Sequence, residues 1–281
     1  MSLVPMSEIL VRARRGGYAV GAFEVWNLES IQAVVDAAEG LAQPVILQVG
    51  PGEADYAGLE DISHAVILRA RRANVPVALH LDHGDTFERV MHCIHHGFTS
   101  VMLDVSHLPY VENVAATKEV VRAAHACGVS VEGELDRIGG GEAGNDVADD
   151  DAHLTDPDQA LEFVRQTGID AFAVAIGTVH GFYRGEPNIR LGLLEKIAAR
   201  VSIPLVLHGG SGTPEADVRR AVSLGIAKVN ICTEFVAAFA DTFAREHDEP
   251  DFRYNVPGVF IKPRVAAQKL VEKKIRLFAG L

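Results

Sequence analysis

The stretch VALHLDHGDTFERVMHCIHHGFTSVMLD, residues 77–104, contains the pattern that decides the fold. It begins with a mostly apolar run, continues with a segment of helical periodicity, and ends in a second apolar run. Apolar runs without polar alternation are typical of parallel strands buried on both faces, and apolar residues recurring every three or four positions indicate an amphipathic helix. The stretch therefore predicts a strand, a helix and a second strand.

The same alternation extends over almost the whole chain. The expected strands are Tyr18–Phe23, Val45–Val49, Val77–Leu81, Ser100–Asp104, Val129–Leu135, Ala171–Ala175, Pro204–Leu207 and Lys228–Ile231. The expected helices are Leu28–Ala42, Ile62–Asn74, Thr86–His96, Val111–Cys127, Pro157–Thr167, Leu191–Arg200, Pro214–Leu224 and Thr233–His247, with a C-terminal helix from about Pro263. Evenly spaced units without a linker favour a single (β/α)8 TIM barrel, residues 1–281, with an additional C-terminal helix, over an open doubly wound sheet.

Composition excludes several classes of function. The chain has 281 residues, with 38 Asp and Glu against 26 Lys and Arg, so its formal net charge is −12. An acidic chain without a dense Lys or Arg run lacks the electrostatic footprint of a nucleic-acid binder. No apolar stretch approaches the ~20 residues of a membrane span, and the start MSLVPMSEILVRARRGG has no signal-peptide core. Cys93, Cys127 and Cys232 have no metal-type spacing. We therefore expect a reduced, cytoplasmic protein without nucleic-acid or membrane partners.

Three of the twelve histidines stand where predicted strands end: His83, His180 and His208. The carboxyl ends of barrel strands surround one mouth, so three imidazoles from different strands can converge there. Three protein nitrogens with one open position are the ligand pattern of catalytic zinc. The alternative for each histidine is a hydrogen-bonded loop residue. His80, inside a predicted strand, either supports this site or belongs to the core.

Carboxylates accompany these histidines at the same predicted face. Asp82 stands beside His83, where it could act as a general base on a metal-bound substrate or orient a histidine. Asp104 and Glu134 end the next two strands, and they either hold a second cation or fix the histidines.

The loops after the last two strands occupy the usual phosphate position of this architecture. They read Gly209-Gly210-Ser211-Gly212 and Asn230-Ile231-Cys232-Thr233. Glycines let backbone N–H groups point at an anion, and the hydroxyls of Ser211 and Thr233 add donors. Two irregular segments, residues 138–156 and 177–190, also follow predicted strands, and such loops act as lids or carry catalytic groups.

Five segments together resemble one family. They are LHLDHGDTFE (79–88), GFTSVMLDVSHLPYVENVAATKEVV (97–121), AIGTVHGFYRGEP (175–187), LVLHGGSGTP (205–214) and KVNICTEF (228–235). Over essentially the full chain, the sequence is similar to the class II, zinc-dependent ketose-bisphosphate aldolases that act on fructose- or tagatose-1,6-bisphosphate.

The resemblance assigns roles to individual positions. It implies zinc ligation by His83, His180 and His208, proton abstraction by Asp82, and an additional cation near Asp104 and Glu134. Glu142 matches a mobile glutamate that transfers a proton at the aldehyde oxygen. The positions matching the dihydroxyacetone phosphate site are Gly181, Gly209, Gly210, Ser211, Asn230 and Thr233, with a monovalent cation (Na⁺ or K⁺) nearby. A homodimer or homotetramer is also implied.

The implied reaction is the reversible cleavage of a ketose 1-phosphate or 1,6-bisphosphate to dihydroxyacetone phosphate and an aldehyde, through a metal-stabilised enediolate. No lysine Schiff base is expected, because Lys228 is placed at the start of its strand, away from the mouth. Two alternatives remain open at this point. One is a metal-dependent hydrolase on the same barrel, and the other is a non-catalytic subunit that binds sugar phosphates.

The chain departs from the family pattern around the aldehyde half of the substrate. Glu24 stands where the family often has Asn, Gly50 where it often has Ser, and Cys232 where Asp, Asn or Ala is usual. Lys262 and Arg264 are only rough matches to a basic residue that holds the second phosphate. A lost hydroxyl and an added carboxylate are expected to disfavour a second phosphate.

Overall fold

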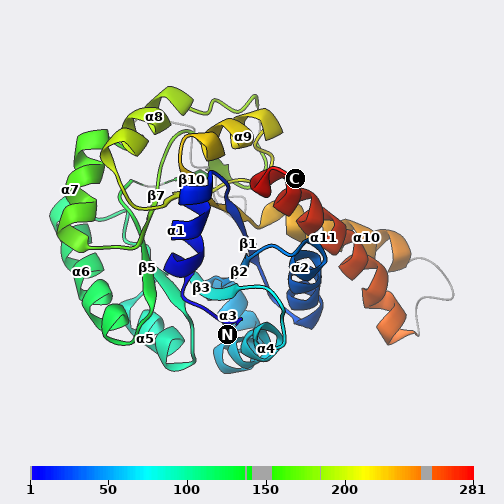
Figure 1. Ribbon diagram of the computed structural model, residues 1–281. Helices are drawn as coiled ribbons and strands as arrows, with labels where there is room; N and C mark the ends of the chain where they lie inside the picture. The colour runs from blue at the N-terminus through cyan, green and yellow to red at the C-terminus, as the bar shows by residue number, and fades with distance from the viewer. Residues whose placement is uncertain (1, 137, 141–153, 184, 248–254) are drawn as a thin grey trace.

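The computed structural model describes residues 2–136, 138–140, 154–183, 185–247 and 255–281. Parallel strands close into a barrel in the order β1-β10-β9-β7-β5-β4-β3-β2 (Figure 1). Their bounds are β1 Val20–Glu24, β2 Val45–Val49, β3 Val77–Gly84, β4 Ser100–Leu103, β5 Ser130–Glu134, β7 Ala171–Ala173, β9 Leu205–Leu207 and β10 Ile226–Ile231. The predicted barrel is confirmed, with strand ends shifted by a few residues.

Helices cover the outside of the barrel (Figure 1). They are α2 Leu28–Leu41, α4 Leu59–Arg71, α5 Phe87–His95, α6 Tyr110–Ala126, α7 Pro157–Thr167, α8 Leu191–Arg200 and α9 Glu215–Ser223. Their apolar faces bury the outward side chains of the strands, as where Phe172 of β7 meets Phe163 of α7 with ring centroids 6.0 Å apart. Each such fully buried side chain contributes roughly 1.5–3 kcal/mol, and their sum holds the strand ends at fixed positions.

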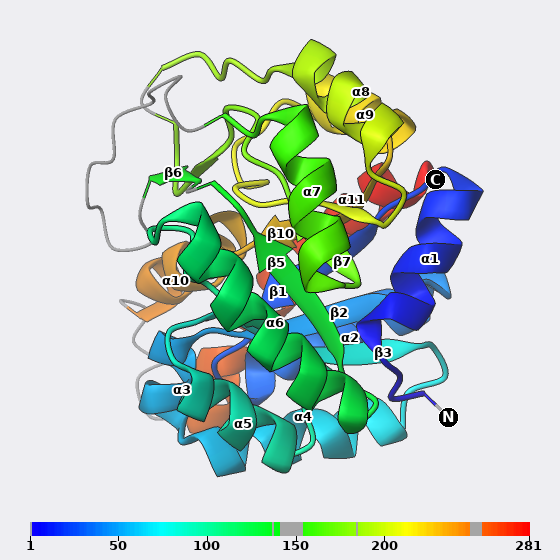
Figure 2. The same ribbon diagram turned by 90° about the vertical axis from the view of Figure 1, so that its left-hand side faces the viewer.

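Helix α1, Met6–Gly16, closes the amino-terminal end of the barrel, and the sequence analysis did not predict it. Its apolar face buries Met6, Leu10 and Ala13 against small residues of the barrel interior such as Ala78. The backbone N–H of Ser7 donates to the hydroxyl of Ser130 in β5. Figure 2 shows α1 at one end of the barrel and strand β6, Gly139–Gly140, at the other. The mouth at the carboxyl end of the strands is therefore the end left for chemistry.

Three further short elements were also not predicted, and all of them lie at that mouth. Helix α3, Pro51–Ala57, follows β2 directly. Strand β6 pairs in parallel with β8, Val179–His180, as a small separate sheet. This pairing joins the segment after β5 to the segment that carries His180, and so fixes where that histidine stands.

The chain ends in helix α10, Thr233–His247, and helix α11, Val256–Ala279, which project together beyond the barrel (Figure 1). The expected start of α11 near Pro263 is wrong, because Pro263 lies inside the helix. A proline removes one intrahelical hydrogen bond, but packing of α11 along α2 and α10 outweighs that loss.

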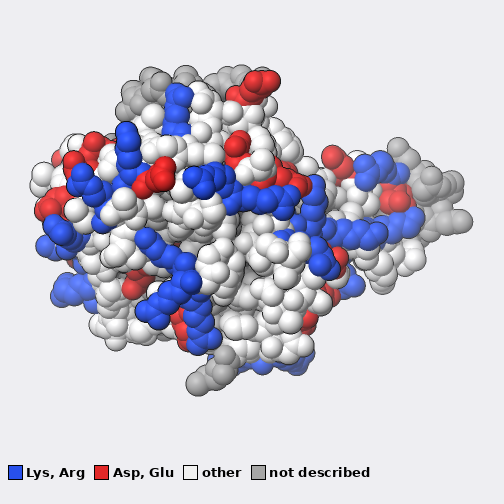
Figure 3. All heavy atoms as spheres, turned by 45° about the horizontal axis from the view of Figure 1, so that its top comes forward, with Lys and Arg blue, Asp and Glu red and all other residues white. Residues whose placement is uncertain are grey.

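Two observations concern the surface charge and the apolar character of the helices. Figure 3 shows acidic and basic side chains interspersed on the face it displays. Within the described parts of the chain, we find no helix that combines the length and the apolar character of a membrane span.

Candidate active site

The end of β3 brings two consecutive side chains to the mouth. Successive residues of a regular strand point to opposite faces, so Asp82 and His83 could not normally both face inward. Here the pairing of β3 with β4 shifts between Leu81 and Gly84, and His83 has a φ of 47°, in the left-handed region that side chains rarely adopt. Such bulges re-aim side chains beside active sites, and the surrounding packing maintains the local strain.

Three histidines converge at this point. His83 comes from β3, His180 from β8 and His208 from the end of β9, and one ring nitrogen of each lies within 4.8 Å of the others. Their ring centroids are 4.7–5.7 Å apart. Gly209 permits this approach, because a Cβ at that position would stand 2.3 Å from the carbonyl oxygen of Val179. Three imidazoles with an open side fit the donor set of a catalytic zinc ion.

Carboxylates orient two of these imidazoles. His83 Nδ1 is 2.7 Å from Asp104 Oδ2, and His208 Nε2 is 2.7 Å from Glu132 Oε1. Each imidazole therefore presents its other nitrogen to the centre, where His208 Nδ1 and His83 Nε2 are 2.9 Å apart. A carboxylate that holds the remote nitrogen of a histidine fixes its tautomer and increases its basicity as a ligand. For Asp104 this contact is the one expected of a carboxylate that fixes a histidine.

A buried ion pair continues this chain of contacts. Lys228 Nζ lies 2.8 Å from Glu132 Oε2, and both side chains are fully buried. The prediction that Lys228 stands at the far end of its strand is wrong, because β10 begins at Ile226 and the side chain reaches the barrel interior beside Glu132. Glu132 was not among the site residues predicted from the sequence. Its position two residues before Glu134, and so on the same strand face, could have indicated it.

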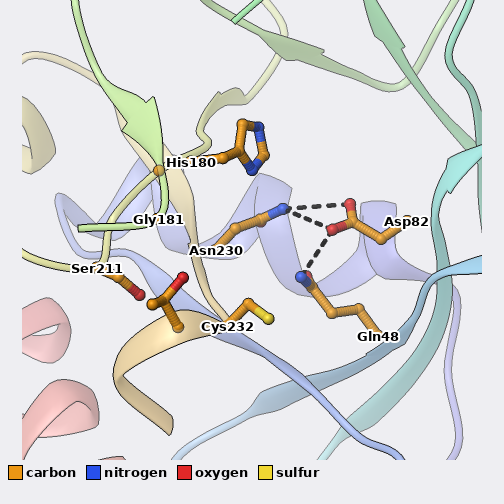
Figure 4. Close-up of a pocket in the computed structure, with 9 residues that line it drawn as sticks. Gln48, Asp82, His180, Gly181, Ser211, Asn230 and Cys232 are labelled. Atoms are coloured by element: carbon orange, nitrogen blue, oxygen red, sulfur yellow. Dashed lines mark hydrogen bonds between the residues drawn. The ribbon is translucent and has the colours of Figure 1, made fainter. Parts of the chain in front are cut away.

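Asp82 is held at the centre of the mouth. Its side chain is buried, and it accepts hydrogen bonds from Gln48 Nε2 at 2.8 Å and from Asn230 Nδ2 at 3.2 Å (Figure 4). Burial opposes ionisation, but the charge of His83 and the neighbouring His80 outweigh it and keep the pKa of Asp82 well below its usual range. The side chain is therefore an ionised carboxylate aimed at the pocket, as a general base requires.

Burial and neighbouring charges shift the pKa values of three other groups in this site in opposite directions. Burial would lower the pKa of His83, but Asp82 and Asp104 raise it well above its ordinary value. Burial and the neighbouring His83 lower the pKa of His180 to about 3. Burial and Asp104 raise the pKa of Glu134 to about 8. Perturbation of several groups in one cleft is typical of functional sites.

Glu134 and His80 occupy different surroundings. Glu134 is buried, and its Oε2 has no hydrogen-bond partner among the described residues, so this oxygen is available to a cation. His80 Nδ1 lies 2.8 Å from Ser100 Oγ, and its Nε2 is 3.7 Å from carboxylates of both Asp82 and Glu132. These three side chains have metal-like spacing, but the ammonium of Lys228 already supplies a cation to that group.

The other end of the pocket has the features of a phosphate site. The pocket as a whole is lined by Gln48, Asp82, His180, Gly181, Gly209, Ser211, Asn230, Cys232 and Thr233. Ser211 Oγ accepts the backbone N–H of Glu234 at 3.2 Å, in the first turn of α10, a helix that begins at Thr233. A helix amino-terminus flanked by glycines and hydroxyls favours an anion. Gly210 does not line the pocket, because its N–H donates to the carbonyl of Asn230.

Two of the expected residues lie apart from this cluster, and the structure does not describe a third. Glu142 lies outside the described residues. Lys262 forms an ion pair with Glu246, and Arg264 donates to Gln32 Oε1 at 2.6 Å, so the structure joins both side chains to helices α10 and α2 rather than to the pocket.

The comparisons with known proteins agree with this fold. A model of the family "Fructose-bisphosphate aldolase class-II" matches residues 4–280. The D-tagatose-1,6-bisphosphate aldolase subunit GatY of Klebsiella oxytoca is 44% identical, over 98% of this chain and 96% of its own. The probable fructose-bisphosphate aldolase of Bacillus subtilis (strain 168) is 45% identical, over 100% of this chain and 99% of its own.

Among solved structures, the YdjI aldolase of Escherichia coli K12 matches with a TM-score of 0.88 and 38% identity, over 98% of this chain and 97% of its own. The chain belongs to the class II fructose-bisphosphate aldolase family, and it is a lyase of the aldolase type. The hydrolase and the non-catalytic alternatives are not favoured.

Proposed function

We propose that this enzyme is a zinc-dependent aldolase that reversibly cleaves a ketose 1-phosphate or 1,6-bisphosphate to dihydroxyacetone phosphate and an aldehyde. The observation that carries the proposal is the meeting of three imidazoles, an ionised carboxylate and a phosphate-type pocket in one mouth. His83, His180 and His208 would hold the zinc ion. When bound, zinc supplies a Lewis acid that stabilises negative charge developing on the substrate oxygens.

In this proposal Asp82 moves the proton at carbon. In the direction of condensation it takes a proton from carbon 3 of dihydroxyacetone phosphate, and in cleavage it returns it. Gln48 and Asn230 bind both oxygens of Asp82, so the carboxylate is held in one orientation before the substrate arrives. On the resemblance, Glu142 transfers the proton at the aldehyde oxygen.

The phosphate of the substrate occupies the end of the pocket at α10. The resemblance assigns Gly181, Gly209, Gly210, Ser211, Asn230 and Thr233 to it, with a Na⁺ or K⁺ ion nearby, and all of these residues except Gly210 line the pocket. An additional cation is assigned to the neighbourhood of Asp104 and Glu134. For Glu134 this is supported by its buried oxygen without a hydrogen-bond partner among the described residues.

The cellular location and the oligomeric state are also part of the proposal. The acidic composition and the family are consistent with a cytoplasmic enzyme that assembles as a homodimer or homotetramer. Sedimentation of the purified chain tests the assembly, because a monomer at micromolar concentration contradicts it.

The phosphate assignment predicts the behaviour of Ser211→Ala. Loss of one hydrogen bond to a charged group costs roughly 1.5–3 kcal/mol, so the KM for a ketose 1-phosphate is expected to rise by about tenfold or more. Steady-state kinetics measure this effect, with kcat changing much less. Ser223→Ala in α9, an exposed serine, is the matched control. An unchanged KM in Ser211→Ala contradicts the assignment.

The buried carboxylate behind His208 predicts a change in metal affinity. Glu132→Gln keeps the shape of the side chain but removes the charge that faces both His208 and Lys228. Loss of such a supporting carboxylate typically weakens metal binding 10- to 100-fold. Titration of zinc against a competing chelator measures this effect without any assay of activity. Glu112→Gln on the exposed start of α6 is the control, and equal affinities in all three proteins contradict the positioning role.

A further inference from the structure

The pocket has a second end, away from α10, formed by Gln48 and Asp82. The inference drawn for it rests on the proposed function. A ketose whose 1-phosphate binds at α10 and whose reacting carbons lie beside the three histidines must continue past Asp82 toward Gln48. The carbons that become the aldehyde product therefore lie next to β1 and β2.

Hydrogen bonding fixes the orientation of the Gln48 amide. Its Nε2 donates to Asp82 Oδ2 at 2.8 Å and to Glu24 Oε2 at 3.0 Å. The ionised carboxylate of Asp82 only accepts hydrogen bonds, so the nitrogen must face it, and the two contacts use both hydrogens of that nitrogen. Gln48 Oε1 then faces away, and among the described residues this buried oxygen has no hydrogen-bond partner.

A buried acceptor without a partner requires a donor. Gln48 lines the pocket, and in Figure 4 the nitrogen of its head group points toward Asp82, so the oxygen lies on the other side of the amide. A sugar hydroxyl at this end is a donor of suitable chemistry, whereas a fully ionised phosphate offers only acceptors.

Glu24 occupies a hydrogen-bond donor that an anion could otherwise bind, in the turn at Gly50 between β2 and α3. Its side chain is buried, and Glu24 Oε1 accepts the backbone N–H of Gly50 at 2.5 Å, at the start of α3. Pro51, the next residue, has no N–H to offer. Glu53 Oε2 lies 2.8 Å from the position a Cβ on Gly50 would take, so the turn has no room for a serine hydroxyl unless Glu53 moves.

We infer that Gln48 and Glu24 determine specificity for the aldehyde half, and that this half is an uncharged polyhydroxylated chain. Gln48 Oε1 accepts a substrate hydroxyl, and Glu24 both holds Gln48 and occupies the N–H of Gly50, so this N–H is not available to a second phosphate. Ketose 1-phosphates are then the preferred substrates over 1,6-bisphosphates.

Condensation of dihydroxyacetone phosphate with two acceptors tests the inference, because D-glyceraldehyde and D-glyceraldehyde 3-phosphate differ only in the phosphate. We expect kcat/KM to be higher for D-glyceraldehyde, by about tenfold, which corresponds to 1.4 kcal/mol. An acceptor phosphate that leaves kcat/KM equal or raises it overturns the inference. An enzyme that condenses neither acceptor instead contradicts the proposed function, so the two failures are distinguishable.

Two variants assign the effect to residues. Glu24→Asn frees the N–H of Gly50, and we expect the kcat/KM ratio to shift at least tenfold toward the phosphorylated acceptor. Gln48→Met removes the acceptor oxygen, and we expect the preference for D-glyceraldehyde over propionaldehyde, which lacks hydroxyls, to fall about tenfold. Each readout is a ratio within one protein, so a general loss of activity does not imitate it. Glu60→Gln on α4, an exposed carboxylate, is the control, and ratios unchanged in both variants overturn the assignment.

Discussion

Replacing Asp82 by Ala is expected to lower kcat for release of dihydroxyacetone phosphate by about a thousandfold, within the 10²–10⁴ range of general acid–base catalysis. Asp82 is a buried carboxylate in the pocket, and Gln48 and Asn230 hold it by both of its oxygens. Among the described residues that line the pocket, Asp82 is the only carboxylate. The initial rate of dihydroxyacetone phosphate release at saturating substrate measures this change in kcat.

The control for this variant is Asp85→Ala, three residues along the same segment. Asp85 is half exposed and pairs with Arg89 rather than with the pocket, so kcat is expected to change less than twofold. Zinc content, measured by elemental analysis, should be equal in both variants. A kcat for Asp82→Ala within tenfold of the unmodified enzyme would show that another group moves the proton.

Removal of the metal is expected to abolish activity, and zinc is expected to restore it. The residues His83, His180 and His208 fit a zinc ion, and the imidazoles of His83 and His208 are already oriented by Asp104 and Glu132. In Asp82→Ala, added zinc should restore nothing, because the missing group is the base. Full activity after exhaustive chelation contradicts the metal-dependent account.

Metal removal also has a readout independent of catalysis. A ligand present at a thousandfold excess over its Kd stabilises the folded state by about 4 kcal/mol, so the metal-free protein should melt several degrees lower. Differential scanning calorimetry with and without zinc measures this shift. Replacement of His208 by Ala should remove the difference between the two conditions, whereas His125→Ala, on an exposed part of α6, should not.

Features of the fold and the site that depend on local sequence pattern could be predicted, whereas those that depend on contacts between residues far apart in sequence could not. The alternation of apolar runs and amphipathic segments predicted the barrel and the strand ends, and with them the meeting of His83, His180 and His208. Local pattern could not predict the bulge at His83, because the shift in pairing arises from contact with β4. Helix α1 was not predicted for a similar reason, because it packs against the amino-terminal end of a barrel whose strands all follow it in the sequence.

Buried polar partners were the hardest to predict. Glu132 and Lys228 lie in strands far apart in sequence, and each alone resembles an unexplained charge in an apolar run. Only the closed barrel places them 2.8 Å apart and next to His208. The same holds for Gln48, whose amide is oriented by Glu24 of one strand and Asp82 of another.

The measurement that tests the central claim most directly is product analysis by NMR of the zinc-loaded enzyme with fructose 1-phosphate, tagatose 1-phosphate and the corresponding 1,6-bisphosphates. The account predicts dihydroxyacetone phosphate and an aldehyde in equal amounts from at least one of these sugars, and neither product after chelation. Release of inorganic phosphate without dihydroxyacetone phosphate would contradict it.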